Sequence, residues 1–459
     1  MNIAPQLLEK YNVPVPRYTS YPPANHFDEQ VTGAEMLELI RSSNNWAPDH
    51  IGFYIHIPFC RKICFYCGCN ACTLKSTSEV TRYVEALKQE IRLVAKALNR
   101  SRKVTQIHFG GGTPNSIPAE MLEEIVRLIR LEFSVSEAAE IAIETNPAYL
   151  DRAYLETLLG VGFNRFSFGI QDFDPQVLRN VNREPSKLPV EQLIGMVRER
   201  NAQAAVNLDF IYGLPGQDEA SFVRTMEQAI ALQPDRLVTF SYAHVPWLKK
   251  HQQILEKKGL PAAAEKTAMF LSGYGALVSA GYKPIGLDHF VKPEDELFQA
   301  LENKQLHRNF QGYCTRKTTG QVYAFGITAI SQLEKAYIQN TKSIDTYVEQ
   351  LSQGNLPVEK GIRVSGEQVV IREVITRLMC NKELDWKLLS EELQVDLPEL
   401  KGILNDAPGQ LAEMEADGLL HRTEGGLTVT ETGSLFIRNI AALFDPAYRQ
   451  QVNKYSKSL

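Results

Sequence analysis

The feature that most constrains the fold is the alternation of short apolar segments with amphipathic helical patterns between Gly52 and Leu287. Short apolar strands that alternate with amphipathic helices are typical of βα units on a parallel sheet. Six such units are too few for a closed eight-stranded barrel, so the pattern predicts an open sheet or a partial barrel. The six predicted strands are 52–57, 104–109, 140–144, 165–169, 205–211 and 236–240.

The sequence divides its 459 residues into three parts. Residues 1–50 are rich in proline and tyrosine, which predicts an extended segment with one short helix near Met36 rather than an independent domain. Residues 51–300 hold the βα units, and the alternation fades in residues 301–459. From Ser365 onward, helical patterns over 369–380, 386–393 and 397–419 precede a strand pair near residue 428, an order similar to that of a winged-helix module. We therefore expect an α/β chain with a mostly helical C-terminal domain.

Charge and hydropathy exclude several classes of protein. The formal charge is −5, which argues against a broadly basic nucleic-acid binder, and the C-terminal part shows no basic recognition stripe. No apolar run is long enough to span a bilayer, and the N-terminus lacks a basic segment followed by an apolar one. We expect a cytoplasmic protein that uses neither a membrane nor a nucleic acid as its partner.

Five of the seven cysteines lie between Cys60 and Cys72. In a reducing compartment such a cluster is typical of metal binding or redox chemistry rather than of disulfides. Cys60, Cys64 and Cys67 have the spacing C-x3-C-x2-C. A tetrahedral zinc site would need Cys69 or Cys72 as a fourth ligand, whereas a four-iron cluster held by three cysteines leaves one iron open to a ligand.

Polar and glycine residues gather where the predicted strands end. The run of glycines 110–112 follows the second strand, and Glu144, Gln171 and Asp209 lie at the ends of later strands. Ligands of parallel α/β folds bind at the carboxyl ends of strands, so these residues are candidate ligand contacts. The glycine run lacks the G-x-G-x-x-G spacing of a dinucleotide site, and we expect it to let the backbone approach a bound cofactor closely.

Residues 60–67 resemble the signature of radical S-adenosylmethionine (SAM) enzymes. Further segments resemble the oxygen-independent coproporphyrinogen III oxidase family over nearly the whole chain. That resemblance implies a three-quarter barrel of six βα units, similar to a partial TIM barrel, with an N-terminal segment that folds over the active site. The segments that carry it are 18–22, 53–59, 67–70, 169–173, 182–184, 209–215, 288–290 and 309–313.

The resemblance also implies the cofactors. Cys60, Cys64 and Cys67 would hold a four-iron, four-sulfur (4Fe-4S) cluster whose fourth iron binds SAM, and two SAM molecules would be bound. Cys69, which is not a cluster ligand in the family, and Tyr54 are implied to take part in catalysis, whereas Cys72 has no implied role. Residues implied to contact SAM are Tyr54, Tyr66, Gly111, Gly112, Thr113, Glu144, Gln171, Arg183, Asp209, Ala243 and Ile330.

Two of these positions depart from the family pattern. Tyr66 stands where many relatives have phenylalanine, and Glu144 is followed by Thr145 and Asn146 where many have valine and aspartate. A backbone contact is the usual role at Tyr66, so we expect the first change to matter little.

The implied reaction is the anaerobic oxidative decarboxylation of two propionates of coproporphyrinogen III to vinyl groups, which gives protoporphyrinogen IX for haem biosynthesis. It would need a low-potential electron donor such as flavodoxin or ferredoxin, and we expect a monomer. Arg17, Arg183 and Arg308 could pair with propionates, and residues 18–22 and 309–311 are candidate lids over the substrate. The alternatives are a radical SAM methyltransferase that opens haem and a haem chaperone built on the same barrel.

Overall fold

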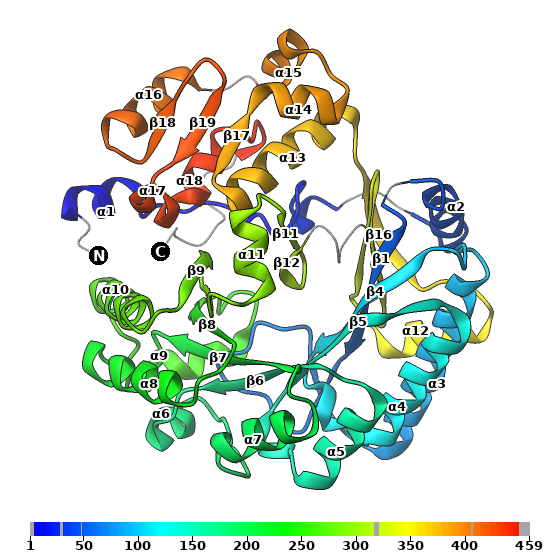
Figure 1. Ribbon diagram of the computed structural model, residues 1–459. Helices are drawn as coiled ribbons and strands as arrows, with labels where there is room; N and C mark the ends of the chain where they lie inside the picture. The colour runs from blue at the N-terminus through cyan, green and yellow to red at the C-terminus, as the bar shows by residue number, and fades with distance from the viewer. Residues whose placement is uncertain (1–3, 28–30, 47, 316–320, 405–406, 449–459) are drawn as a thin grey trace.

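The computed structural model describes residues 4–27, 31–46, 48–315, 321–404 and 407–448. A twelve-stranded sheet curves through the molecule, with helices along its outer face (Figure 1). Six neighbouring parallel strands form its middle, which confirms the predicted α/β partial barrel. These strands are β1 (His50–Ile57), β4 (Lys103–Gly111), β5 (Ser134–Thr145), β6 (Arg165–Gln171), β7 (Ala205–Tyr212) and β8 (Arg236–Ser241).

The main core lies between the sheet and its outer helices. Side chains alternate between the two faces of a strand, so Phe53 and Ile55 of β1 are buried in the core. Tyr54 and His56 therefore share the opposite, concave face of that strand. The outer helices are α3 (Thr77–Ala95), α4 (Ala119–Glu132), α5 (Arg152–Val161), α6 (Pro175–Asn180), α7 (Val190–Arg200), α8 (Glu219–Ala231) and α10 (Ala263–Ser279).

The sheet continues beyond residue 300, where we expected the barrel to end. β13 (Gln321–Phe325) runs parallel to β1 on the side opposite β4. The strands that follow are antiparallel, and hairpins rather than helices join the first of them, so the alternation of the first 300 residues gave no sign of them. They are β14 (Ile330–Leu333), β15 (Ala336–Asn340) and β16 (Val358–Arg363), with α12 (Ile344–Ser352) before the last. The other sheet edge carries β10 (His289–Val291) and β9 (Lys283–Gly286), and α11 (Glu296–Glu302), β11 (Leu306–Asn309) and β12 (Gly312–Thr315) come next in the chain.

The C-terminal part is mostly helical, as expected, and a third strand, which the sequence did not predict, joins the expected strand pair in a small sheet. The helix expected over 397–419 is instead two helices, and Pro408 begins the second of them, where a proline needs no backbone hydrogen bond. The elements are α13 (Gly366–Asn381), β17 (Glu383–Asp385), α14 (Trp386–Leu393), α15 (Leu397–Leu404), α16 (Pro408–Ala416), β18 (Leu420–Arg422), β19 (Gly426–Val429), α17 (Glu431–Leu435) and α18 (Ile437–Ala442).

The N-terminal segment packs against this C-terminal part. Tyr11, Val15 and Tyr18 share a buried cluster with residues of α13 and α18, and the Tyr18 hydroxyl donates a hydrogen bond to Asp445 over 3.0 Å. In Figure 1 the helix α1 (Pro5–Tyr11), which the sequence did not predict, lies beside α17 and α18. The helix expected near Met36 is α2 (Gly33–Ser43). No helix among the described residues is both long and apolar enough to cross a membrane.

Candidate active site

Three cysteines line a loop that leaves β1 at its carboxyl end. Cys60 lies in the short strand β2 (Phe59–Cys60), which pairs with β3 (Cys72–Thr73), and Cys60 and Cys64 are buried. The Thr113 hydroxyl oxygen lies 3.3 Å from the sulfur of Cys60. The Arg183 guanidinium donates to the sulfur of Cys64 over 3.8 Å. Burial raises the pKa of the Cys60 thiol to about 11, and the Thr113 hydroxyl opposes this shift. Donors beside the sulfurs stabilise thiolates, which are the form that binds a metal–sulfur cluster, so this donor set fits such a cluster.

Cys69 interacts with the third of these cysteines. The Cys69 thiol donates a hydrogen bond to the sulfur of Cys67 and lowers the pKa of Cys67. Side chains that follow β8 hold the same loop by its backbone: the His251 imidazole donates to the Cys67 carbonyl over 2.9 Å, and Lys249 donates to the Cys69 carbonyl over 2.8 Å. Gln252 donates to the carbonyl of Tyr66 over 2.9 Å. The loop that carries the thiols is therefore fixed from the far side of the barrel.

Two histidines complete a polar chain on the concave face. The ring nitrogen Nε2 of His56 faces the Asn70 carbonyl at 3.0 Å, so Nε2 carries the proton and Nδ1 accepts from the Tyr54 hydroxyl at 3.2 Å. Burial lowers the pKa of His56, which keeps this imidazole neutral. His108 stacks on the Tyr54 ring and lies 2.9 Å from the Glu144 carboxylate. Neither histidine was predicted from the sequence as a site residue. The two-residue spacing of Tyr54 and His56 does place these two side chains on one face of a strand.

The glycines after β4 are needed for close contacts within the protein. Gly111 has a φ of +115°, and a Cβ there would lie 2.7 Å from the His56 ring. A Cβ at Gly112 would lie 2.5 Å from the carbonyl oxygen of Pro58. Gly112 also donates to the Ile57 carbonyl over 2.8 Å. The absence of a side chain at both positions therefore makes room for β1 and the start of the cysteine loop, and the contact of these glycines with a cofactor stays a prediction.

Gln171 and Arg183 keep polar atoms available at the strand ends. Gln171 ends β6 with a φ of +72°, and its buried Oε1 has no hydrogen-bond partner within the described part of the chain. The Nε of Arg183 is likewise buried and unpartnered among the described residues, while its Nη2 donates to the Gly169 carbonyl. Asp209 instead accepts hydrogen bonds from Ser167 and Asn207, and burial raises its pKa. Gln171 and Arg183 therefore each have one polar atom that could form a hydrogen bond with a ligand.

The remaining predicted contacts lie along the same edge of the sheet. Ala243 follows β8, is exposed, and accepts a hydrogen bond from Gln252 over 3.2 Å. Ile330 begins β14, near the opposite end of the strand order, and packs against a cluster that includes Phe27. Tyr66 packs against a small apolar cluster between β7 and β8. The predicted residues thus follow the carboxyl edge of the sheet from β14 to β8.

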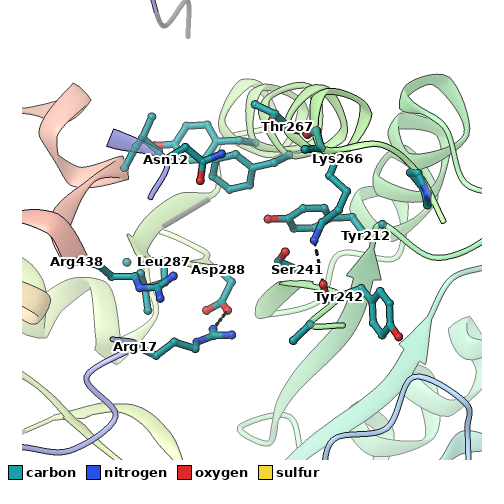
Figure 2. Close-up of a pocket in the computed structure, with 18 of the residues that line it drawn as sticks. Asn12, Arg17, Tyr212, Ser241, Tyr242, Lys266, Thr267, Leu287, Asp288 and Arg438 are labelled. Carbon is teal, nitrogen blue, oxygen red and sulfur yellow. Dashed lines mark hydrogen bonds and ion pairs between the residues drawn. The ribbon is translucent and has the colours of Figure 1, made fainter. Parts of the chain in front are cut away.

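A cavity of about 300 Å³ opens between the ends of β7 and β8, the helix α10 and the C-terminal helices (Figure 2). Arg17 of the N-terminal segment reaches into it and pairs with Asp288 over 2.7 Å. Lys266 of α10 donates to the Tyr242 carbonyl over 2.9 Å. Ala243 also lines the cavity, so the cavity adjoins one of the residues expected to contact SAM.

The charge in this cavity is predominantly positive. Arg17, Lys266, Lys382 and Arg438 line it, with Asp288 as its single carboxylate. Burial lowers the pKa of Lys266 and of Lys382. Burial and the neighbouring charges of Arg17 and Arg308 lower the pKa of Arg438 to about 9, although Arg438 also donates to backbone carbonyls of the N-terminal segment. Crowded cations of this kind favour the binding of an anion. Of the four cations that line the cavity, only Arg17 was predicted from the sequence as a candidate anion partner. Arg308, which was also predicted, donates to the Arg17 carbonyl over 2.9 Å.

Comparison with known proteins agrees with this geometry. Residues 54–229 match the Radical SAM superfamily, and residues 364–436 match the HemN C-terminal domain. An oxygen-independent coproporphyrinogen III oxidase of Synechocystis is 40% identical over 450 residues, which cover 98% of this chain and 96% of that protein. The Escherichia coli protein of the same name is 37% identical over 446 residues, covering 97% of this chain and 95% of that one. The chain belongs to the oxygen-independent coproporphyrinogen III oxidase family.

A solved structure extends the match to three dimensions. The coproporphyrinogen III oxidase (HemN) of Escherichia coli, described as a radical SAM enzyme, superposes with a TM-score of 0.89 at 33% identity, covering 97% of this chain and 99% of that one. The expectations of a radical SAM oxidoreductase of this family, with its α/β partial barrel, are confirmed. The family also confirms an iron–sulfur cluster and SAM as the cofactors, and Cys60, Cys64 and Cys67 are the thiols whose surroundings fit the cluster.

Proposed function

We propose that this chain converts coproporphyrinogen III to protoporphyrinogen IX without oxygen, by oxidative decarboxylation of two propionates to vinyl groups. The observation that carries the proposal is the juxtaposition of the three-cysteine loop with a cationic cavity at one edge of the sheet. When bound, the cluster and SAM supply a 5′-deoxyadenosyl radical that removes a hydrogen from the substrate. The hydrogen removed would be the β-hydrogen of a propionate, which would then lose one electron and carbon dioxide to leave a vinyl group.

The chain's own side chains would hold two SAM molecules along the strand ends. His108 contacts one carboxylate oxygen of Glu144 and leaves the other available for an ammonium or a ribose hydroxyl. The unpartnered oxygen of Gln171 and the unpartnered Nε of Arg183 would serve as an acceptor and a donor for a ligand. Polar groups fixed in this way cost little reorganisation when the ligand binds.

The cavity of Figure 2 would hold the part of the tetrapyrrole that carries unreacted propionates. Its volume of about 300 Å³ suits part of such a molecule rather than all of it. Lys266 and Arg438 would pair with carboxylates there. Because Arg17 enters from the N-terminal segment, we propose that residues 4–27 cover the bound substrate and help to exclude water.

Three further properties fit this role. All seven cysteines are free thiols, which suits a reducing compartment such as the cytoplasm. The reaction requires one electron for each SAM consumed, which a low-potential flavodoxin or ferredoxin would supply. We also propose that the active form is a monomer.

The test is an anaerobic assay of the reconstituted protein with coproporphyrinogen III, SAM and dithionite, followed by mass spectrometry. Protoporphyrinogen IX and 5′-deoxyadenosine in a ratio of about 1:2, as expected for one SAM consumed per propionate, are the predicted products. A methylated or opened haem product with added haem would instead support the methyltransferase. Tight haem binding without turnover would support the chaperone.

A further inference from the structure

The segment that holds the cysteine loop from the far side also reaches the protein surface. It runs from His244 through the 3-10 helix η4 (Lys250–Gln252) and the helix α9 (Gln253–Glu256) to Lys258. Its side chains donate to the backbone carbonyls of Tyr66, Cys67 and Cys69, over 2.8 to 2.9 Å. Any surface that this segment presents is therefore directly connected to the loop that binds the cluster.

That surface is apolar at its centre. Trp247 is 73% exposed and Leu248 is 72% exposed, and Ile254 is 39% exposed a few residues later. Seven large apolar side chains are exposed among the described residues, and these three fall within eight consecutive positions. A cluster of exposed apolar side chains next to a reactive centre marks an interaction site more often than a solvated face. Trp247 and Leu248 are not among the residues that line the cavity of Figure 2.

The rim of this surface is basic. Lys250, Lys257 and Lys258 are exposed and flank the apolar residues along the segment, and the one carboxylate in the segment, Glu256, is bound by His244 over 2.9 Å. The chain as a whole carries a charge of −5, so this excess of positive charge is local. A local field of this kind steers an acidic partner toward the surface.

We propose that residues 247–258 form the docking surface for a small acidic protein that carries single electrons. This inference rests on the proposed function, which consumes one electron for each SAM. In the step itself the reduced carrier loses one electron and the cluster gains it, and no bond forms or breaks in either protein. Trp247 would be the apolar anchor and the lysines the steering charges, because redox encounters use small interfaces that depend on charge.

The experiment measures reduction of the reconstituted cluster by excess reduced flavodoxin in an anaerobic stopped-flow instrument, without substrate. The variants are Trp247→Ser with Leu248→Ser, and separately Lys250→Glu, whose side chain has no assigned role in the site. We expect each to slow the reaction at least tenfold at low salt, and Lys250→Glu to reduce its dependence on ionic strength. Leu131→Ser on α4, where Leu131 is also 73% exposed, and Lys96→Glu after α3 are the matched controls and should react like the parent.

Turnover driven by dithionite separates this inference from the proposed function. Dithionite is small and needs no docking surface, so the variants should keep the parent's dithionite-driven activity. Unchanged reduction by flavodoxin in both variants would overturn the docking surface. A parallel loss of dithionite-driven activity would also overturn it, because the surface would then belong to the substrate site or the fold. Absence of product from the parent with dithionite would contradict the proposed function instead, while the rates of reduction by flavodoxin could still be compared.

Discussion

Arg183 lies against Cys64, with its guanidinium nitrogen 3.8 Å from the sulfur, although 119 residues separate the two in the chain. A cation that donates to a cluster sulfur stabilises the reduced, more negative state of the cluster. Arg183→Met should therefore lower the cluster reduction potential by on the order of 60 mV, the equivalent of about 1.4 kcal/mol for one electron. A redox titration monitored by electron paramagnetic resonance without SAM measures this shift. The surface variant Arg179→Met is the control, and an equal potential in both variants would show that the contact has no electrostatic effect.

Cys69 should be required for turnover but not for the cluster. Its thiol donates to Cys67 and lowers the pKa of Cys67, and a serine hydroxyl is a far weaker acid than a thiol. Cys69→Ser should keep the parent's iron and sulfide content and lose at least about tenfold in turnover, a cost of about 1.4 kcal/mol in the barrier. Cys72→Ser, in β3, should keep both the iron and sulfide content and the turnover of the parent. Full activity of Cys69→Ser would show that this cysteine is a bystander.

Lys266 should contribute to substrate affinity through its charge. If it pairs with a propionate, Lys266→Met should raise the KM for coproporphyrinogen III roughly 10- to 100-fold, because a hydrogen bond to a charged group is worth about 1.5–3 kcal/mol. Lys266→Arg keeps the charge and should recover most of the affinity. Release of 5′-deoxyadenosine without substrate should be the same in all three proteins. A KM that does not change in Lys266→Met would place the propionates elsewhere.

Glu140 should make the free energy of unfolding depend on pH in the acidic range. Burial opposes its ionisation, but the charges of Arg165 and Arg236 outweigh burial and lower the pKa of Glu140 to about 2, against an ordinary value of 4.5. The resulting stabilisation is complete above about pH 5 and is lost as the pH falls from 4.5 toward 2. Glu140→Gln should therefore lower the free energy of unfolding by about 3 kcal/mol at pH 7 and by much less at pH 3. Urea denaturation at the two pH values checks this, and an equal difference at both would contradict the ion-pair explanation.

Local periodicity was sufficient to predict six βα units on a parallel sheet, because each of the six strands carries its own apolar pattern, and the family resemblance implied that the sheet is a partial barrel. The strands from β13 to β16 were not predicted, since hairpins join β13, β14 and β15 without the helices that marked the first six strands. The cysteine loop was predicted from three residues that are close in the sequence. The contact between Arg17 and Asp288 was not, because it joins residues 271 positions apart and depends on how the N-terminal segment crosses the barrel. His56 and His108 were missed because a histidine in a strand has no distinctive sequence pattern.

The central claim is that Cys60, Cys64 and Cys67 hold an iron–sulfur cluster that leaves one iron free for SAM. Anoxically purified protein should contain about four iron and four sulfide per chain and should release 5′-deoxyadenosine when reduced in the presence of SAM. Serine at any one of the three positions should abolish both the cluster and the release of 5′-deoxyadenosine. Zinc in place of iron and sulfide, or a full iron content that survives one of these substitutions, would contradict the account.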